Sequence, residues 1–340
     1  MTSLLIFAAL ALLLAAVFWP RAGILARISR LRLLSERVRV EDALKHFYDC
    51  ETRGLPGTLE GLAGVLETSR GSALKILERA EAMELVVAAP EGFTLSETGR
   101  AYALRVLRTH RLLERFLADR TGTRPAEWHR QAERREHQLS LDETELLARR
   151  MGHPLYDPHG DPIPTATGDV PAVRGTPLSY VTPGTSVRVT HLEDEPVEAF
   201  QRLLDQGFTL ELVLRVVEVT RELIRYEVDG HEKTLARALA GNVTVEPVAD
   251  PGVLDAGVIS LDQLAVDESG AVVGISPACR GPQRRRLLDL GVVPGTEIRA
   301  VMKSAAGDPI AYDIRGALIA LRREQAGWIR VRRASAEVAA

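Results

Sequence analysis

The feature that most constrains this chain is a pair of short segments rich in histidine and glutamate. In the first segment, His110 and Glu114 stand four residues apart. The second segment places its members at offsets of zero, four, seven and eight: His129, Glu133, Glu136 and His137. Such spacings collect side chains on one face of an α-helix, so both segments are predicted to be helical. Imidazoles and carboxylates on converging helix faces could hold a divalent cation.

A simpler explanation competes with a metal site, because glutamate and histidine on an arginine-rich helix commonly form a solvated, salt-bridged surface. The metal hypothesis is favoured by the apolar Leu112, Leu113, Phe116 and Leu117, which supply a separate packing face. The donors are nitrogen and oxygen without thiolate, which suits Mn²⁺ or Fe²⁺ better than a cysteine-rich structural zinc site. The order of metal affinities alone also admits zinc, cobalt or nickel.

Length, charge and cysteine content narrow the class of protein. A chain of 340 residues can form two or more domains, and a net charge of −3 gives no global basic field for nucleic acid. Any DNA contact would therefore come from a local patch. Cys50 and Cys279 form no CxxC pair, which favours a reducing compartment. The sequence contains no glycine-rich phosphate loop, nucleophile elbow or Ser-His-Asp order, so we expect no enzyme.

The amino terminus predicts a membrane anchor. Residues Leu4 to Trp19 are continuously apolar, which is about the lower limit for crossing a bilayer. A cleaved signal peptide is the competing interpretation. The arginine-rich segment 21–39, expected to be a basic juxtamembrane helix, places the rest of the chain in the cytoplasm by the positive-inside rule. We therefore expect a single-pass protein of the inner or cell membrane with cytoplasmic carboxyl-terminal domains.

Residues 40–100 predict a winged helix-turn-helix. Helices are expected at 40–50, 58–66 and 72–83, followed by a hairpin of strands 85–89 and 93–95. The second helix of such a motif normally enters the DNA major groove. The candidate DNA-binding residues at that helix are Ser69, Arg70, Ser72, Lys75 and Arg79. Helices with this pattern also serve purely as protein-interaction modules.

Beyond Pro164 a polar linker leads into two similar modules. Both contain a Leu-Leu-Asp-x-Gly sequence, at 203–207 and at 287–291, followed by a comparable series of expected strands. This self-similarity predicts an internal repeat of two small SH3-like β-barrels, at 177–248 and 256–333. The run Arg284-Arg285-Arg286 is interpreted as a solvated face or a protein contact.

The order of these motifs resembles the diphtheria-toxin-repressor family of iron- and manganese-dependent regulators. The resemblance covers about residues 40–165 and includes Leu95-Ser-Glu-Thr-Gly-Arg100, His110-Arg-Leu-Leu-Glu114 and Pro158-His-Gly-Asp-Pro-Ile-Pro164. It implies a metal-binding and dimerisation domain at 101–165, a regulatory Mn²⁺ or Fe²⁺, a homodimer and operator DNA as a partner. The second carboxyl-terminal module resembles FeoA domains, whereas the first resembles either a FeoA domain or the SH3-like domain of the repressor family.

The resemblance also implies two metal sites. The primary site would comprise Asp42, Glu133, Glu136 and His137, and the ancillary site His110, Glu114 and His129. Asp42 and Glu133 stand where iron-responsive members carry methionine and cysteine, which resembles the manganese-responsive branch. Lys45 stands where that branch has a carboxylate, and an ammonium there would repel a second cation.

Two further groups of residues are not expected to bind metal. In the repressor family the SH3-like domain can lend ligands to the ancillary site, but the matching positions here are Pro196 and Ala199. Their neighbours Glu195 and Glu198 could ligate only if the register is shifted. A histidine-containing loop rich in proline and glycine is interpreted as structural; its members are His153, Asp157 and His159.

Together these patterns predict an α+β multidomain protein with a transmembrane anchor at 1–20, the winged helix-turn-helix, the helical metal-binding domain and two SH3-like barrels. The predicted function is a membrane-tethered, metal-dependent transcriptional regulator that binds DNA as a dimer. The alternative is a membrane accessory or sensor of ferrous-iron transport that contacts a transporter and does not bind DNA.

Overall fold

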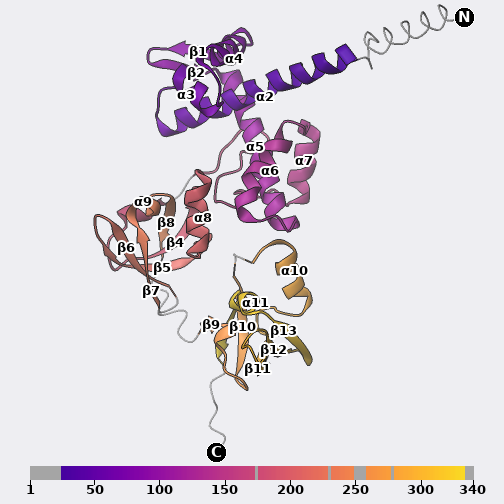
Figure 1. Ribbon diagram of the computed structural model, residues 1–340, viewed down its shortest axis with the longest axis vertical. Coiled ribbons are helices and arrows are strands. Elements are labelled where there is room, and N and C mark those ends of the chain that lie inside the picture. The colour runs from indigo at the N-terminus through magenta and orange to yellow at the C-terminus, as the bar shows by residue number, and fades with distance from the viewer. Residues whose placement is uncertain (1–23, 173–174, 229–230, 249–257, 277–278, 334–340) are drawn as a thin grey trace, which may run out of the picture. The chain divides into compact units, whose positions relative to one another are not determined.

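The computed structural model describes residues 24–172, 175–228, 231–248, 258–276 and 279–333 (Figure 1). The chain forms two units. The first comprises the described residues up to Thr109 with Glu136–Leu141 and Pro164–Asp169. The second comprises His110–Arg135, Asp142–Ile163 and the described residues from Val170 onward.

The first unit is a winged helix-turn-helix that continues into a long helix. Its elements are α2 (Ile24–Arg53), α3 (Leu59–Val65), α4 (Arg70–Ala82), β1 (Val86–Ala89), β2 (Gly92–Leu95) and the beginning of α5 (Glu97–Arg120). Two separate helices were expected at 21–39 and 40–50, but the structure has a single α2. Neither glycine nor proline interrupts residues 24–50, so nothing in the sequence ends the first helix.

Side-chain caps set the turn between the two short helices. The Thr58 hydroxyl accepts a hydrogen bond from the Gly61 N–H at 3.0 Å, and the Ser69 hydroxyl accepts one from the Ser72 N–H at 3.3 Å. Each cap satisfies a backbone donor that the first helical turn leaves without an intrahelical partner. The caps therefore fix where α3 and α4 begin.

A buried apolar cluster joins these elements, and a carboxylate ties the wing to α2. Phe47 and Leu77 are almost fully buried in this core. The Thr94 hydroxyl and the Leu95 N–H donate to Glu51 of α2, at 2.5 and 2.9 Å. The wing is thus hydrogen-bonded to the helix that also carries Asp42.

The helical part of the second unit contains the end of α5, α6 (Trp128–Glu136) up to Arg135, and most of α7 (Leu141–Arg150). A loop that follows α7 is shaped by Asp157, whose Oδ1 accepts hydrogen bonds from the N–H groups of His159, Gly160 and Asp161 at 2.8 to 2.9 Å. Arg111 of α5 donates to the Pro162 carbonyl at 2.6 Å. These bonds hold the loop against α5.

The remainder of the second unit contains two six-stranded antiparallel sheets with matching topology. The first has the order β3-β8-β4-β5-β6-β7, and the second has β9-β14-β10-β11-β12-β13. Taken in chain order, the strands of the two sheets correspond one to one. The internal repeat predicted from Leu-Leu-Asp-x-Gly is therefore present in the structure.

The bounds of the two copies are as follows. The first contains β3 (Thr176–Pro177), β4 (Ser186–Leu192), α8 (Val197–Asp205), β5 (Val213–Val219), β6 (Leu223–Val228), β7 (His231–Ala236), α9 (Arg237–Ala240) and β8 (Val243–Pro247). The second contains β9 (Val258–Ser260), β10 (Ser269–Ile275), α10 (Gly281–Asp289), β11 (Glu297–Lys303), β12 (Ile310–Ile314), β13 (Ala317–Leu321), α11 (Arg323–Gly327) and β14 (Ile329–Arg333). Each copy buries an apolar core of its own, around Tyr226 in the first and Tyr312 in the second.

The expected membrane anchor needs a correction. Residues 1–20 lie outside the described part of the chain. Among the helices that the structure does describe, none combines the length and the apolar character needed to cross a membrane. The longest, α2, is interrupted by charged residues throughout its sequence, and each charge at membrane depth is costly. The described helices therefore do not support the predicted single-pass membrane localisation.

The start of α5 depends on a close backbone approach that generates a stability prediction. A Cβ atom at Gly99 would lie 1.8 Å from the Leu85 carbonyl oxygen. Gly99→Ala should lower the free energy of unfolding by about 2 kcal/mol, because the backbone must shift to relieve the clash. Gly64→Ala is the matched control, since no atom lies within 4 Å of its added Cβ and α3 favours alanine there. Urea unfolding measures both, and equal stability of the two variants would contradict the packing argument.

Candidate metal centres

The structure brings together three of the four predicted primary-site residues, which we call the first cluster: Asp42, Glu136 and His137. Asp42 lies on α2, Glu136 is the last residue of α6 and His137 follows it. The His137 Nε2 atom is 3.3 Å from Asp42 Oδ1 and 3.3 Å from Glu136 Oε1. One donor atom from each residue lies within 4.8 Å of the others, which is a spacing that a single cation can bridge. All three residues belong to the first unit.

A residue that the sequence did not single out orients this histidine. His137 Nδ1 is 2.5 Å from Glu41 Oε2, and the Glu41 carboxylate also accepts hydrogen bonds from Tyr102 at 2.5 Å and Arg37 at 2.7 Å. With Nδ1 hydrogen-bonded to Glu41, Nε2 faces the two carboxylates of the cluster. A carboxylate behind a ligating histidine fixes the ring and its tautomer in many metal sites. The one sequence signal that could have identified Glu41 is its position immediately before Asp42 on the same helix.

Charge in this cluster is balanced by protein groups. Burial would lower the pKa of His137, but hydrogen bonds to Asp42 and Glu41 and the charge of Glu136 outweigh it and raise the pKa to about 9. Burial would raise the pKa of Glu41, but hydrogen bonds from His137, Tyr102 and Arg37 lower it below its ordinary value. A cation that binds here must therefore displace a proton from His137.

Lys45 adds a second cationic group to the first cluster. Its Nζ atom lies 2.9 Å from Glu136 Oε1, and the Glu136 side chain is fully buried. The ammonium therefore compensates a carboxylate that would otherwise carry an unbalanced buried charge. Like charges repel, so Lys45 favours one bound cation over two in this cluster.

The fourth predicted primary ligand, Glu133, is placed elsewhere. Its carboxylate lies 3.5 Å from His129 Nε2, one helical turn earlier on α6, and its side chain is 51% exposed. Both residues lie in the second unit. Glu133 and His129 are four residues apart on α6, and this spacing brings their side chains together on one helical face.

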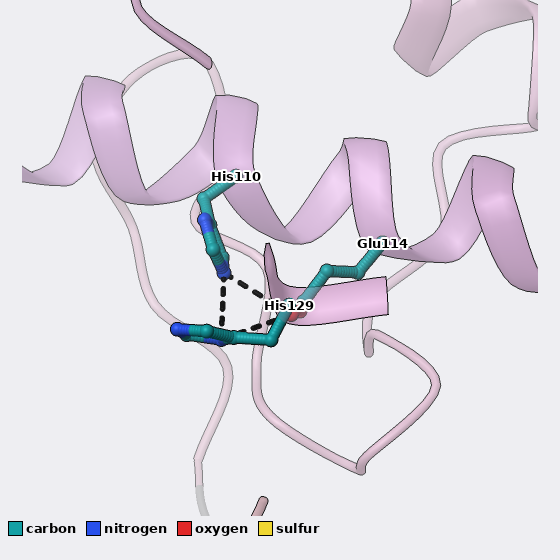
Figure 2. A group of neighbouring side chains, drawn as sticks. All are labelled: His110, Glu114 and His129. Carbon is teal, nitrogen blue, oxygen red and sulfur yellow. Dashed lines mark hydrogen bonds and ion pairs between the residues drawn. The ribbon is translucent and has the colours of Figure 1, made fainter. Parts of the chain in front are cut away.

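The predicted ancillary residues form the second cluster, which consists of His110 and Glu114 from α5 and His129 from α6. Figure 2 shows the two imidazoles and the carboxylate converging. His110 Nε2 lies 3.1 Å from Glu114 Oε1 and 3.3 Å from His129 Nδ1, and His129 Nδ1 lies 3.3 Å from the same carboxylate oxygen. These donors also lie within 4.8 Å of one another.

Three residues that the sequence did not assign to a metal site extend the second cluster. His159 Nε2 lies 3.9 Å from Glu114 Oε1 and 3.8 Å from Asp194 Oδ2, and Asp194 Oδ2 is 3.1 Å from His129 Nδ1. Glu195 reaches His129 Nε2 at 3.4 Å. The acidic residues come from the loop between β4 and α8, one or two positions before Pro196; Glu195 was one of the two neighbours considered for a shifted register, and Asp194 was not. His159 was interpreted as structural and instead faces the cluster.

The polar groups of the second cluster fit a divalent cation. Within the described residues, both ring nitrogens of His159 are buried and make no hydrogen bond, whereas the buried Glu114 Oε1 is contacted by the imidazoles of His110 and His129. Buried polar atoms without partners are costly, and a bound cation would satisfy them. Burial would raise the pKa of Glu114, but His110, His129 and His159 hold it well below its usual range. Burial would likewise lower the pKa of His129, but Asp194, Glu114 and Glu133 raise it to about 12.

The other members of the histidine-containing loop take no part in either cluster. His153 is exposed, with a φ of 49°, just after α7. Asp157 is buried and accepts the three backbone hydrogen bonds that shape the loop around His159. Their structural interpretation agrees with these positions.

The five DNA-binding candidates lie at the beginning and along one side of α4. Ser69 and Ser72 take part in the helix cap, and their hydroxyls are 3.0 Å apart. Arg70 pairs with Glu60 at 3.2 Å and Arg79 with Glu36 at 3.0 Å, all largely exposed. Lys75 is exposed.

Parts of the chain match two domain families. Residues 96–165 match the iron-dependent repressor metal-binding and dimerisation domain. Residues 176–247 and 259–333 each match the FeoA domain, so both copies of the repeat are of this type.

The individual proteins that are similar to this chain include repressors. The iron-dependent repressor IdeR of Mycobacterium tuberculosis is 31% identical over 219 residues, which cover 60% of this chain and 95% of that protein. The diphtheria toxin repressor of Corynebacterium diphtheriae is 32% identical over 197 residues, covering 55% of this chain and 84% of that protein. Among solved structures, a manganese-dependent transcriptional repressor in complex with manganese superposes with a TM-score of 0.56 at 29% identity, covering 62% of this chain and all of the other.

The geometry of the second cluster predicts that His159 contributes to metal binding. His159→Leu should weaken binding of one Mn²⁺ per chain by roughly tenfold or more, because it removes a buried nitrogen facing Glu114 and Asp194. Isothermal titration calorimetry and metal analysis measure the affinity and the number of bound ions. His153→Leu is the matched control and should leave both unchanged. Equal losses in the two variants would count against the assignment of His159.

Proposed function

The chain belongs to the iron-dependent repressor family, and on that premise we propose that it is a metal-dependent transcriptional regulator of metal homeostasis. It binds operator DNA as a homodimer, with Mn²⁺ or Fe²⁺ as the regulatory cation, and it is not an enzyme. The observation that carries this proposal is the first cluster, which joins α2 of the winged helix-turn-helix to the end of α6.

The first cluster couples metal binding to the position of the DNA-binding helix. Asp42 lies on α2, and α2 packs against both α4 and the wing strand β2. Glu136 and His137 close the far end of α6, whose beginning belongs to the second unit. A bound cation supplies the positive charge that holds these carboxylates and the imidazole together. Restraining Asp42 against Glu136 and His137 therefore restrains α2, and through α2 the helix α4.

Several residues prepare the cluster for a single cation. Glu41 keeps His137 Nε2 directed at the site, and Tyr102 and Arg37 hold Glu41 in turn. Lys45 shares Glu136 with any bound ion. For metal to act as a signal, it must bind the DNA-competent arrangement more tightly than other arrangements. The difference in affinity between the two arrangements sets how far DNA binding responds.

The second cluster is proposed as an ancillary site with the ligands His110, Glu114 and His129, joined by His159 and Asp194. Asp194 belongs to the first FeoA copy, whereas Glu114 and His129 lie on α5 and α6. Metal in this cluster would therefore tie the FeoA copy to the helices of the dimerisation domain.

The helix α4 is proposed to read DNA through Ser69, Arg70, Ser72, Lys75 and Arg79. Its exposed basic side chains suit contacts with phosphates, which position a protein on the duplex. The alternative role in ferrous-iron transport rested on the membrane anchor and on FeoA-like modules that contact a transporter. Both FeoA copies match, whereas none of the described helices supports an anchor.

Selection from a pool of random DNA duplexes tests the function. We expect the full chain to enrich specific sequences in the presence of Mn²⁺ or Fe²⁺, and His137→Ala to lose at least about tenfold of the metal-dependent affinity, because a primary ligand is gone. Binding is measured by fluorescence anisotropy at several salt concentrations. His153→Ala is the control and should behave as the wild type. If metal leaves the DNA affinity of the wild-type chain unchanged at low salt, the proposed function is wrong.

The salt dependence of binding tests the role of α4. Lys75→Gln should reduce the slope of log affinity against log salt by about 1, because each neutralised phosphate releases condensed counterions. Lys233→Gln, which removes an exposed lysine from β7 of the first FeoA copy, should leave the slope unchanged. Identical slopes for wild type and Lys75→Gln would exclude Lys75 from the DNA contact.

A further inference from the structure

A cleft of about 440 Å³ lies in the second unit, outside both metal clusters. One wall is the end of α5, and the other is α10 with the residues just before it, from the second FeoA copy. Its charged lining residues are Arg115, Asp119, Arg280, Arg284 and Arg285. Cys279 and Leu288 supply an apolar part of the wall. We call this feature the arginine cleft.

The two walls approach each other closely at Gly281. Gly281 has a φ of 57°, and a Cβ atom there would lie 2.6 Å from the Thr121 carbonyl oxygen and 3.1 Å from that of Ala118. A side chain at this position would force the walls apart, and its backbone conformation also favours glycine. The cleft is thus built by a close approach that the sequence permits at Gly281.

Basic side chains outnumber acidic ones among the residues that line the arginine cleft. Four guanidinium groups line it with a single carboxylate, Asp119. That carboxylate is already shared: Arg115 Nε lies 2.6 Å from Oδ2, and Arg280 Nη1 lies 3.7 Å from Oδ1. Burial and then the charge of Arg115 lower the pKa of Arg280, and the charges of Asp119 and Asp157 act in the opposite direction. Guanidinium groups stay charged at neutral pH, so the lining remains predominantly basic.

The position of the cleft has a counterpart in the first FeoA copy. There, the loop between β4 and α8 directs Asp194 toward His129 and approaches Glu114 of α5 through His159. In the second copy, the equivalent loop between β10 and α10 brings Arg280 to Asp119, one turn further along α5. Equivalent loops of the repeat therefore carry acidic groups to a cation cluster in one copy and basic groups to a cleft in the other.

We propose that the arginine cleft binds a small polyvalent anion bearing phosphate or carboxylate groups. Guanidinium groups bind phosphate groups and carboxylate groups through paired, charge-assisted hydrogen bonds. The volume falls within the range of small-molecule sites, and an apolar wall beside a few convergent polar groups is typical of them. This site goes beyond the proposed metal-dependent DNA binding and does not depend on it.

Calorimetric titration of the full chain with pyrophosphate and with citrate tests the proposal. Both anions chelate metals, so the protein is first stripped over a chelating resin, and ionic strength is kept constant. The wild type should bind one anion per chain. Binding of pyrophosphate alone would identify a phosphate ligand, and binding of citrate alone a carboxylate ligand.

Two neighbouring arginines of α10 provide matched variants. Arg285 is exposed and lines the cleft, so Arg285→Gln should weaken anion binding roughly tenfold while leaving the thermal unfolding temperature unchanged. Arg286 is also exposed but does not line the cleft, so Arg286→Gln should leave binding unchanged. Absence of saturable binding to the wild type at about 1 mM anion would overturn the proposal. Equal weakening by both variants would also overturn it, because it would show diffuse attraction to a basic helix.

Discussion

The structure depends on the neutralisation of its buried carboxylates, because each of them requires a positive counter-charge. Glu41, Glu114 and Glu136 are 1%, 2% and 4% exposed, and an isolated buried anion would be strongly destabilising. Around Glu41 and Glu136 the chain supplies its own cations and hydrogen-bond donors, among them Lys45 and the His137 imidazole. Around Glu114, the imidazoles of His110, His129 and His159 supply the counter-charge. Both clusters thus balance buried carboxylates with cationic groups of the protein.

Two helices connect these environments. Along α5, Tyr102 donates to Glu41, which orients His137 of the first cluster, and about two and three turns later His110 and Glu114 belong to the second cluster. Along α6, His129 belongs to the second cluster and Glu136 to the first. In the second unit, the loop of the first FeoA copy reaches His129 of α6 and the equivalent loop of the second copy reaches Asp119 of α5, and the chemistry of that loop differs between the copies.

Several parts of this organisation were open to sequence reasoning. Helical spacing predicted that His110 and Glu114 share a face, and the family resemblance grouped them with His129; the structure places the three side chains together. The elements of the winged helix-turn-helix lie close to their predicted positions, since their caps and turns are local signals. Other parts were not. Glu133 is four residues from both His129 and His137, so the spacing alone cannot decide which of the two imidazoles its carboxylate contacts. The apolar amino terminus predicted a membrane anchor, and residues 1–20 lie outside the described part of the chain.

By itself, the sequence determined the local structure and the chemical character of the sites: which segments are helical, where they are capped, that the carboxyl-terminal half is a repeat, and that nitrogen and oxygen donors stand in register. Only the tertiary structure decided which distant residues complete those sites. Glu41 reaches His137 across 96 positions. His159 and Asp194 meet Glu114 and His129 through loops whose own sequences carry no metal-binding pattern. The physical reason is that local spacing fixes a side chain's direction on its own helix, whereas its partners are set by how separate elements pack.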